Sequence, residues 1–251
     1  MTITPNTVPN TPDELRAAAA RNNAEWCAAV SRSGHFRDAV WCSPRRTPPL
    51  YPDAVTLTPE AAPAEVLAGV DTAAPGCSVK DSFASLDLAP AGFEVLFEAQ
   101  WIHRPAGPAT PTTPTTPTTT DGRLDWAELE APGELAAWEA AWDGEESTGL
   151  FHEGLLREGI VFLAGRDGAR IVAGAVLSTG GGVVGVSNLF AHHDAHDDAH
   201  ADAAWAAALD AAARHWPELP VVGYERGEDL DTAVRAGFTP LGPLRIWLHT
   251  A

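Results

Sequence analysis

Imidazoles and carboxylates are concentrated in one short stretch of the chain, between His192 and Asp202. His192, His196 and His200 follow one another at intervals of four residues, a spacing that places side chains on one face of a helix. Such nitrogen and oxygen donors suit Zn, Ni or Co, so a metal site is one interpretation. The sequence DAHDDAHADAA is also an imperfect repeat, which is typical of a solvated low-complexity loop. We favour the loop and predict no required metal.

The same stretch lies between an apolar strand, Val183–Ala191, and an alanine-rich helix. A helix N-terminus presents free backbone N–H groups, which usually suit an anion such as a phosphate. Here the residues before and within the first turn of the helix carry carboxylates and imidazoles instead. A pH response is a third interpretation, because imidazoles protonate near a pKa of about 6.5 and would then admit an anion.

Three further polar groups have both a chemical and a structural interpretation. The segment Ser78–Ser82 holds Lys80, the only lysine of the chain, which forms either a polar cluster at the junction of two halves or a local ion pair with Asp81. His152–Glu153 is either an acid/base pair or an ordinary loop. Arg45–Arg46 provides two cations, too few to indicate an anion site.

Composition excludes several classes of function. A formal charge of −18 argues against nucleic acid and anionic membranes as partners, because both require clustered Lys and Arg. The three cysteines show no CxxC spacing, so neither a disulfide framework nor a zinc finger is indicated. No segment approaches the roughly 20 apolar residues that span a bilayer, and we expect a cytoplasmic protein.

A Pro/Thr-rich segment at residues 105–122 divides the chain into an N-terminal half, 1–104, and a C-terminal half, 123–251. In the first half the capping box that begins at Thr11 predicts a helix to about Arg32. A short strand is predicted at 55–59 and a short helix at 64–70. Two further strands are predicted at 77–83 and 93–103.

The second half shows clearer patterns. Residues 124–142 have near-helical spacing of tryptophan and leucine, interrupted at Pro132–Gly133, and predict two helices. Three apolar β-branched runs at 160–164, 171–178 and 183–190 predict an antiparallel meander. A helix at 202–215, a strand at 219–224, a short helix at 230–236 ending at Gly237, and a strand at 244–249 complete the order.

This order of elements resembles the GNAT superfamily of acyl-CoA-dependent N-acetyltransferases. The resemblance covers roughly residues 121–251 and is carried by the segments GVVGVSNLFA and VVGYERGEDLDTAVRAGF. It implies an α/β (α+β) fold with a mixed, mostly antiparallel central sheet flanked by helices. Ala91-Gly92-Phe93 and the strand after it resemble fragments of a second, degenerate unit, as in tandem GNAT proteins. A cleft is expected between the halves.

The resemblance implies acetyl-CoA or another acyl-CoA as the donor. The pantetheine arm would pair with the strand at Ser187, Asn188 and Leu189. A gapless alignment places His196, Ala199 and Ala201 on the Q/R-x-x-G-x-G/A motif that binds pyrophosphate. Alanine carries a Cβ where the family has glycine, and nearby aspartates cost on the order of 1 kcal/mol beside a phosphate. We therefore expect this degenerate loop to bind coenzyme A poorly.

The resemblance also implies a general acid four residues before the Gly237–Phe238 pair, where this chain has Ala233. Tyr224 is the candidate substitute, and Glu225 is the candidate general base by position. The implied function is N-acyltransfer to a small-molecule amine or peptide. The alternative is a catalytically inactive GNAT-fold binding or regulatory protein. The amine, the acyl group and the oligomeric state stay open, with a homodimer as one possibility.

Overall fold

A computed structural model of the chain describes residues 8–107, 124–144, 146–192 and 199–250. Within them, one sheet of eleven strands has the order β1-β2-β3-β4-β11-β5-β10-β9-β8-β7-β6. The strands are β1 (His35–Phe36), β2 (Val40–Cys42), β3 (Ala54–Thr56), β4 (Ser78–Asp81), β5 (Phe93–Arg104), β6 (Asp125–Glu128), β7 (Ile160–Asp167), β8 (Arg170–Gly180), β9 (Val183–Ala191), β10 (Val221–Glu225) and β11 (Thr239–His249). The helices are α1 (Pro12–Ser31), α2 (Pro63–Leu67), α3 (Pro132–Asp143), α4 (Ala199–His215) and α5 (Gly227–Arg235), with 3-10 turns at Ala89–Ala91 and Glu153–Leu155.

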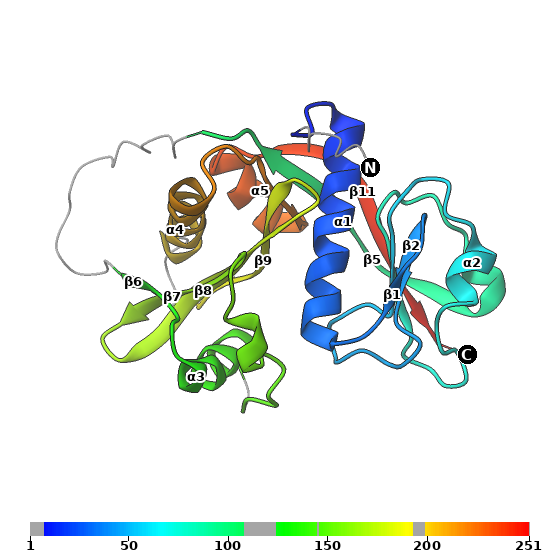
Figure 1. Cartoon of the computed structure of the whole chain (residues 1–251), viewed down its shortest axis with the longest axis horizontal. Helices are drawn as coiled ribbons and strands as arrows, with labels where there is room; N and C mark the ends of the chain where they lie inside the picture. Colours follow the sequence, from blue (N-terminus) through cyan, green and yellow to red (C-terminus); the bar gives the residue numbers. More distant parts are fainter. Residues whose placement is uncertain (1–7, 108–123, 145, 193–198, 251) are drawn as a thin grey trace, which may run out of the picture.

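Helix α1 crosses the middle of the sheet and contacts strands from both halves of the chain (Figure 1). It begins with a complete capping box, in which Thr11 and Glu14 satisfy each other's backbone N–H groups, and it ends at Arg32 in the left-handed conformation. The helix approaches the β8–β9 hairpin closely at Gly180, Gly181 and Gly185, where a Cβ would collide with α1. Glycine at these positions therefore lets α1 lie directly on the sheet.

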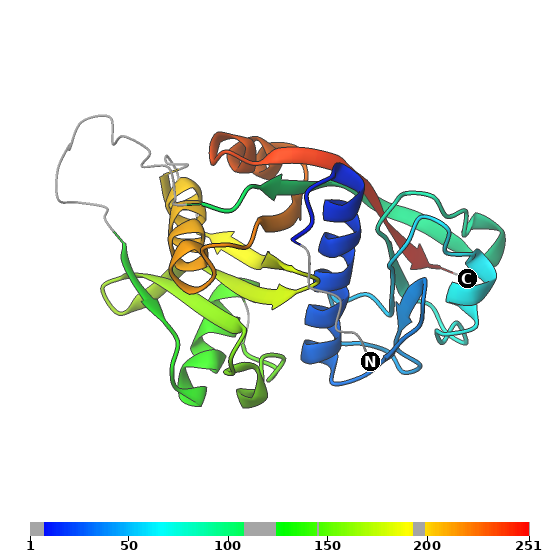
Figure 2. The same ribbon diagram turned by 45° about the horizontal axis from the view of Figure 1, so that its top comes forward.

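The helices form two layers, one on each face of the sheet. Helices α1 and α3 pack on one face, around Trp26, Trp138 and Phe162. On the opposite face, α4 packs around Trp205, and α2 covers the strands of the first half through Val66. Figure 2 shows the sheet running between these layers along the length of the molecule.

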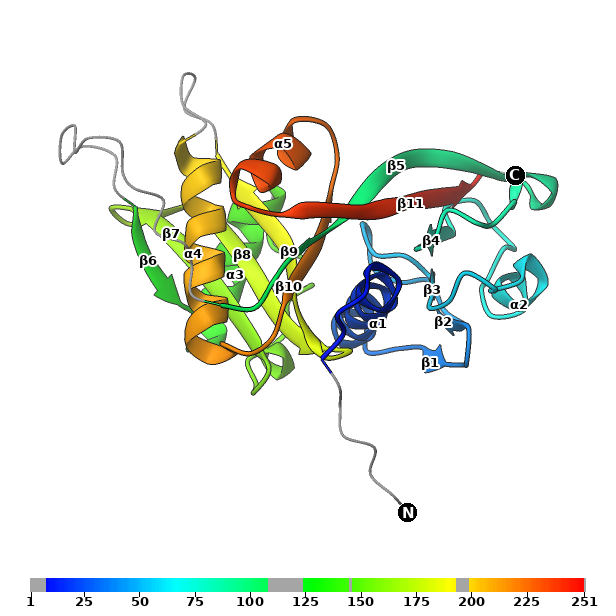
Figure 3. The ribbon, with the colours of Figure 1, turned by 90° about the horizontal axis from the view of Figure 1, so that it is seen from above.

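The two halves exchange strands at the centre of the sheet. Strand β5 of the first half lies between β10 and β11 of the second, and β11 lies between β4 and β5 of the first. Strands β5 and β11 pair antiparallel along almost their whole length. Phe93 lies opposite His249 at one end, and His103 lies opposite Thr239 at the other. Figure 3 shows these two long strands side by side, crossing from one half to the other. The sheet is therefore continuous across the sequence boundary predicted at residue 104.

Most predicted elements are confirmed, and one segment is corrected. Residues 125–128 form an edge strand paired with β7 instead of a helix, so one helix, α3, forms in the segment where two were predicted. Glu128 within this strand binds Arg214 and His215 of α4, a distant contact that helical spacing does not reveal. Strands β1 and β2 were not predicted. Most of the predicted linker lies outside the described residues, and no described helix is long and apolar enough to cross a membrane.

Candidate active site

The parallel strands β9 and β10 separate after a short paired segment. Their register pairs Val184 with Val221 and Gly185 with Val222, and the pairing stops there. Strand β10 continues instead along β5, as far as Glu225 opposite Gln100. The backbone of β9 after Gly185 therefore faces an opening in the sheet rather than a neighbouring strand.

A β-bulge lies in β9 beside this opening. The β8–β9 register shifts between Gly174 and Val176, and Asn188 adopts the left-handed conformation with φ = 51°. Asparagine tolerates this conformation better than most residues. Its Oδ1 accepts hydrogen bonds from Trp26 Nε1 at 3.1 Å and from the Tyr51 hydroxyl at 3.2 Å. The bulge is thus held by α1 and by a loop of the first half.

A cavity of about 750 Å³ occupies the space between the opening, α1 and the loop at residues 46–53. Ser187, Asn188 and Leu189 line it from β9, and Tyr224 and Glu225 line it from β10. The other walls are mostly apolar and come from both halves, through Trp26, Tyr51, Leu96, Phe97, Trp142 and Ile246. This volume suits a small ligand. The structure therefore brings together five sequence-predicted site residues at one cavity.

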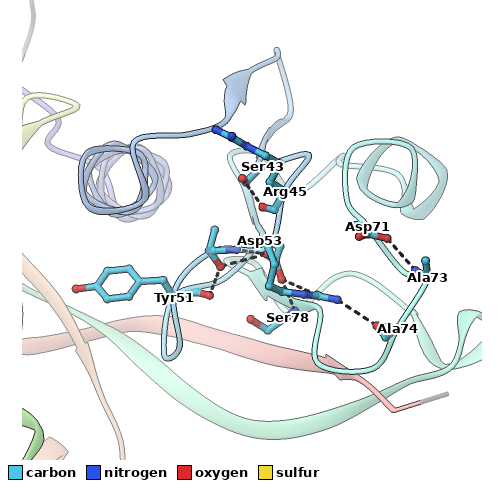
Figure 4. A network of polar contacts seen from close by, with 10 residues as sticks. Ser43, Arg45, Tyr51, Asp53, Asp71, Ala73, Ala74 and Ser78 are labelled. Carbon is cyan, nitrogen blue, oxygen red and sulfur yellow. Dashed lines mark hydrogen bonds and ion pairs between the residues drawn. The ribbon is translucent and has the colours of Figure 1, made fainter. Parts of the chain in front are cut away.

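The loop that closes the cavity is organised by Asp53. This carboxylate accepts hydrogen bonds from Arg46 Nη1 at 3.0 Å, the Thr47 backbone N–H at 2.8 Å and the Ser78 backbone N–H at 3.0 Å. Figure 4 shows Asp53 at the centre of these contacts, with the Tyr51 ring pointing away from them. Burial raises the pKa of Tyr51 well above its usual value, so its phenol stays protonated and donates to Asn188.

Glu225 ends β10 and lines the cavity. Burial raises the pKa of Glu225 to about 8, and the negative charge of Asp229 on α5 contributes in the same direction. A carboxyl with this pKa exchanges protons near neutral pH, as a general base or acid must. Tyr224, the preceding residue, packs edge-on against Trp101 with ring centroids 5.6 Å apart.

Lys80 enters the same cavity from β4 and is 3% exposed. Its Nζ donates to Asn23 Oδ1 at 2.8 Å and lies 3.9 Å from the centroid of the Tyr224 ring. Asp81 binds backbone N–H groups, including that of Leu86 at 2.9 Å, and not Lys80. The predicted ion pair with Asp81 is therefore not formed, and the hydrogen-bond partner of Lys80 is Asn23 of α1 rather than the aspartate and serines beside it in the sequence.

The predicted pyrophosphate loop is only partly described. His196 lies outside the described residues, Ala199 is the first residue of α4, and Ala201 follows in its first turn. Asp202 in the same turn pairs with Arg235 of α5 at 3.2 Å, so this carboxylate has a counter-ion. The described residues contain no group of three or more potential metal ligands.

Other sequence candidates lie away from the cavity or have structural partners. His152 contacts the Ala29 carbonyl at 3.1 Å and does not line the cavity. Arg46 lines the cavity but is engaged by Asp53. Sequence reasoning assigned no role to Asn23, Trp26 or Tyr51, which reach the cavity only because α1 and the proline-rich loop fold over β9. Local patterns contain no signal for that arrangement.

No protein-family model and no curated protein matches this sequence. Solved structures do. A GCN5-related N-acetyltransferase from Kribbella flavida is 16% identical, with a TM-score of 0.63 over 93% of this chain and 96% of that one. A GNAT-family acetyltransferase structure from Novosphingobium aromaticivorans is 14% identical, with a TM-score of 0.58 over 93% and 99%.

This chain has the GNAT fold. The similarity covers most of the chain, more than the C-terminal half on which the sequence resemblance was based. Identities this low carry the fold and no residue roles. Within this fold, the opening between β9 and β10 and the cavity beside it form the candidate site.

Proposed function

We propose that this protein is an N-acyltransferase that uses an acyl-CoA donor. The observation that carries the proposal is the cavity shared by the separated strands β9 and β10, with the carboxyl of Glu225, whose pKa is raised to about 8, on its wall. A reactive thioester in the opening and an amine in the cavity would meet at this place. Bringing two reactants together in an enclosed site is itself a large source of rate enhancement.

The residues around the opening fit an acyl-CoA. The β9 backbone from Val186 to Asn188 has no strand partner on the side of β10, so its polar groups are available to an extended amide-containing arm. The N-terminal end of α4 follows β9 and would face the phosphates. Arg235, 3.2 Å from Asp202, offsets one of the carboxylates that the sequence places there. When bound, the thioester supplies an activated acyl group.

The chain's own residues provide the proton transfers. Glu225 accepts the proton from the amine nitrogen as the N–C bond forms, directly or through water. Backbone N–H groups of β9 polarise the carbonyl under attack. Tyr224 is the candidate donor to the sulfur as the C–S bond breaks, since it lines the cavity next to Glu225. The nitrogen is thereby acylated, and a free thiol leaves.

Calorimetric titration with acetyl-CoA and a longer acyl-CoA, combined with a thiol-release assay over a panel of amines, tests the proposal. We expect binding in the micromolar range or weaker, and thiol release that depends on both the acyl-CoA and an amine. If no acyl-CoA binds at about pH 6 or about pH 8, with or without divalent metal, the proposal is wrong.

A second candidate is a GNAT-fold protein that binds a ligand without catalysis. It is favoured by Ala233, which is fully buried and leaves no phenol at the position where the resemblance implies the acid. The same assay distinguishes the two functions. Acyl-CoA binding with no thiol release over the whole amine panel would support the non-catalytic protein.

A further inference from the structure

The cavity contains a cation that the transfer chemistry does not use. Lys80 is the only lysine among 16 basic residues, and it is 3% exposed. Strand β4 pairs with β3 on one side and with β11 on the other, where Ile246 lies opposite Lys80. Burying an ammonium is costly unless polar groups or an anion compensate its charge. The position of Lys80 therefore requires an explanation.

The described partners of this ammonium are neutral. Its Nζ has three donors, of which one binds Asn23 Oδ1 at 2.8 Å, while the Tyr224 ring lies 3.9 Å away. No ion pair of the described residues involves Lys80. The neighbouring carboxylates are otherwise engaged, since Asp53 binds Arg46 and Asp81 binds backbone N–H groups. An anionic group of a ligand would accept the remaining N–H donors of Lys80 and balance its charge.

We propose that the acceptor is an amino acid, and that Lys80 binds its carboxylate while its amine is presented to Glu225. The inference rests on the N-acyltransferase function proposed above. Lys80 Nζ lies 3.9 Å from the centroid of the Tyr224 ring, and Lys80, Tyr224 and Glu225 all line the one cavity, so the anion site and the base open on the same space. An amino acid carries both groups that the proposal requires, a carboxylate for Lys80 and an amine for Glu225.

The walls of the cavity define the rest of the acceptor. Trp26, Phe97, Trp142 and Ile246 line the cavity and favour an apolar or aromatic side chain. One ammonium balances one carboxylate, whereas a phosphate dianion would leave a charge unmatched inside a chain of net charge −18. The chemistry of the site therefore favours the carboxylate over a phosphate.

Direct binding measurements test this inference without any acyl transfer. Calorimetry would compare phenylalanine with phenethylamine, tryptophan with tryptamine, and leucine with isoamylamine, each against the full chain without acyl-CoA. We expect the member with the carboxylate to bind about tenfold more tightly in at least one pair, as a charge-assisted contact predicts. Inorganic phosphate is the competing anion, and we expect it to displace the amino acid only weakly.

Two variants locate the effect at Lys80. Lys80→Met keeps the length of the side chain without the charge, and the preference for the carboxylate should disappear. Asn23→Asp supplies an internal carboxylate at 2.8 Å from Nζ, so it should also abolish the preference while the buried cation stays paired and the fold stays intact. Arg214→Met removes an exposed cation of α4 and should leave the preference unchanged.

Equal binding within all three pairs, a preference that survives in Asn23→Asp, or tight displacement by phosphate would each overturn the inference. Failure of the proposed function looks different. In that case the amino acids would bind with the Lys80-dependent preference, but no acyl-CoA would bind and no thiol would be released. Transfer to amines that lack a carboxylate, with no preference in binding, would leave the acyltransferase standing and remove the amino acid.

Discussion

Glu225 stands at the end of β10, where burial and Asp229 raise its pKa to about 8. A base is active only when deprotonated, so acyl transfer should rise with pH and level off above about 8. Glu225→Gln should lower kcat by about 10²- to 10⁴-fold and abolish this pH limb. The measurement is a pH–rate profile from thiol release.

Asp229→Asn is the matched control for this profile. Removing the nearby negative charge lowers the pKa of Glu225, so the rise should move to lower pH while the maximal rate is retained. An unchanged pH limb in Glu225→Gln would show that another group titrates and that Glu225 is not the base.

The same pKa shift predicts how stability depends on pH. The Glu225 carboxyl has a reference pKa of 4.5, which represents the unfolded chain, and about 8 in the folded protein. Because the folded pKa is raised, this group's contribution to stability is fully present below about 4.5 and is lost as the pH rises through about 8. Urea unfolding of wild type and Glu225→Gln should therefore show the wild type losing stability relative to the variant over this window. Parallel pH dependence in the two proteins would contradict the assigned shift.

At the scale of elements, the bulge of β9 is the feature that shapes the opening. Asn188 combines a left-handed backbone, φ = 51°, with hydrogen bonds from Trp26 and Tyr51. Asn188→Gly loses the two hydrogen bonds, but glycine adopts the left-handed backbone conformation without strain. Asn188→Ala loses the same hydrogen bonds, and its Cβ also makes the left-handed conformation unfavourable. Asn188→Ala should therefore be less stable than Asn188→Gly by about 1 kcal/mol, measured by urea unfolding.

Tyr51→Phe serves as the control for this pair because it removes one of the two donors and leaves the backbone of β9 unchanged. It should cost about 0.5–1.5 kcal/mol. Equal stability of the glycine and alanine variants would show that the left-handed conformation imposes no strain at position 188.

Local patterns predicted the elements that depend on local contacts. The capping box at Thr11 specifies the start of α1, and the β-branched runs separated by glycine turns specify β7, β8 and β9. Residues 125–128 were predicted as a helix because Trp126 and Leu129 have near-helical spacing. Their conformation is decided by pairing with the edge of β7, a contact made 35 or more residues away along the chain. The spacing of apolar residues carries no record of such a partner.

In the candidate site too, local patterns predicted some residues, and contacts between distant segments determine the others. Ser187, Asn188, Tyr224 and Glu225 were predicted because they belong to two strands of the C-terminal half that resemble strands of the GNAT superfamily. Their surroundings come from the first half, through α1, β4 and the loop at residues 46–53, and no local pattern specifies those contacts. Lys80 was noticed as the only lysine, but its place beside Tyr224 depends on the exchange of β5 and β11.

At the scale of the whole molecule, the exchanged strands make each half dependent on the other. Strand β5 is bonded on one side to β10 and on the other to β11, while β11 also pairs with β4. If the halves were produced separately, the fragment 1–107 would keep β5 without either neighbour of the second half. The fragment 124–251 would keep β10 and β11 without the strand between them. Each would expose a long unpaired edge and apolar surface.

Splitting the chain between residues 107 and 124 tests this dependence without cutting any described element. We expect neither fragment alone to unfold cooperatively, and we expect the two to co-purify and regain cooperative unfolding when expressed together, because pairing of β5 with β10 and β11 restores the central sheet. Circular dichroism and size-exclusion chromatography provide the measurements, with the intact chain as reference. A single fragment that is monomeric and unfolds cooperatively by itself would show that its core does not require the exchange. In the reassembled pair, acyl transfer should return together with the β5–β10 pairing, since the cavity takes its walls from both fragments.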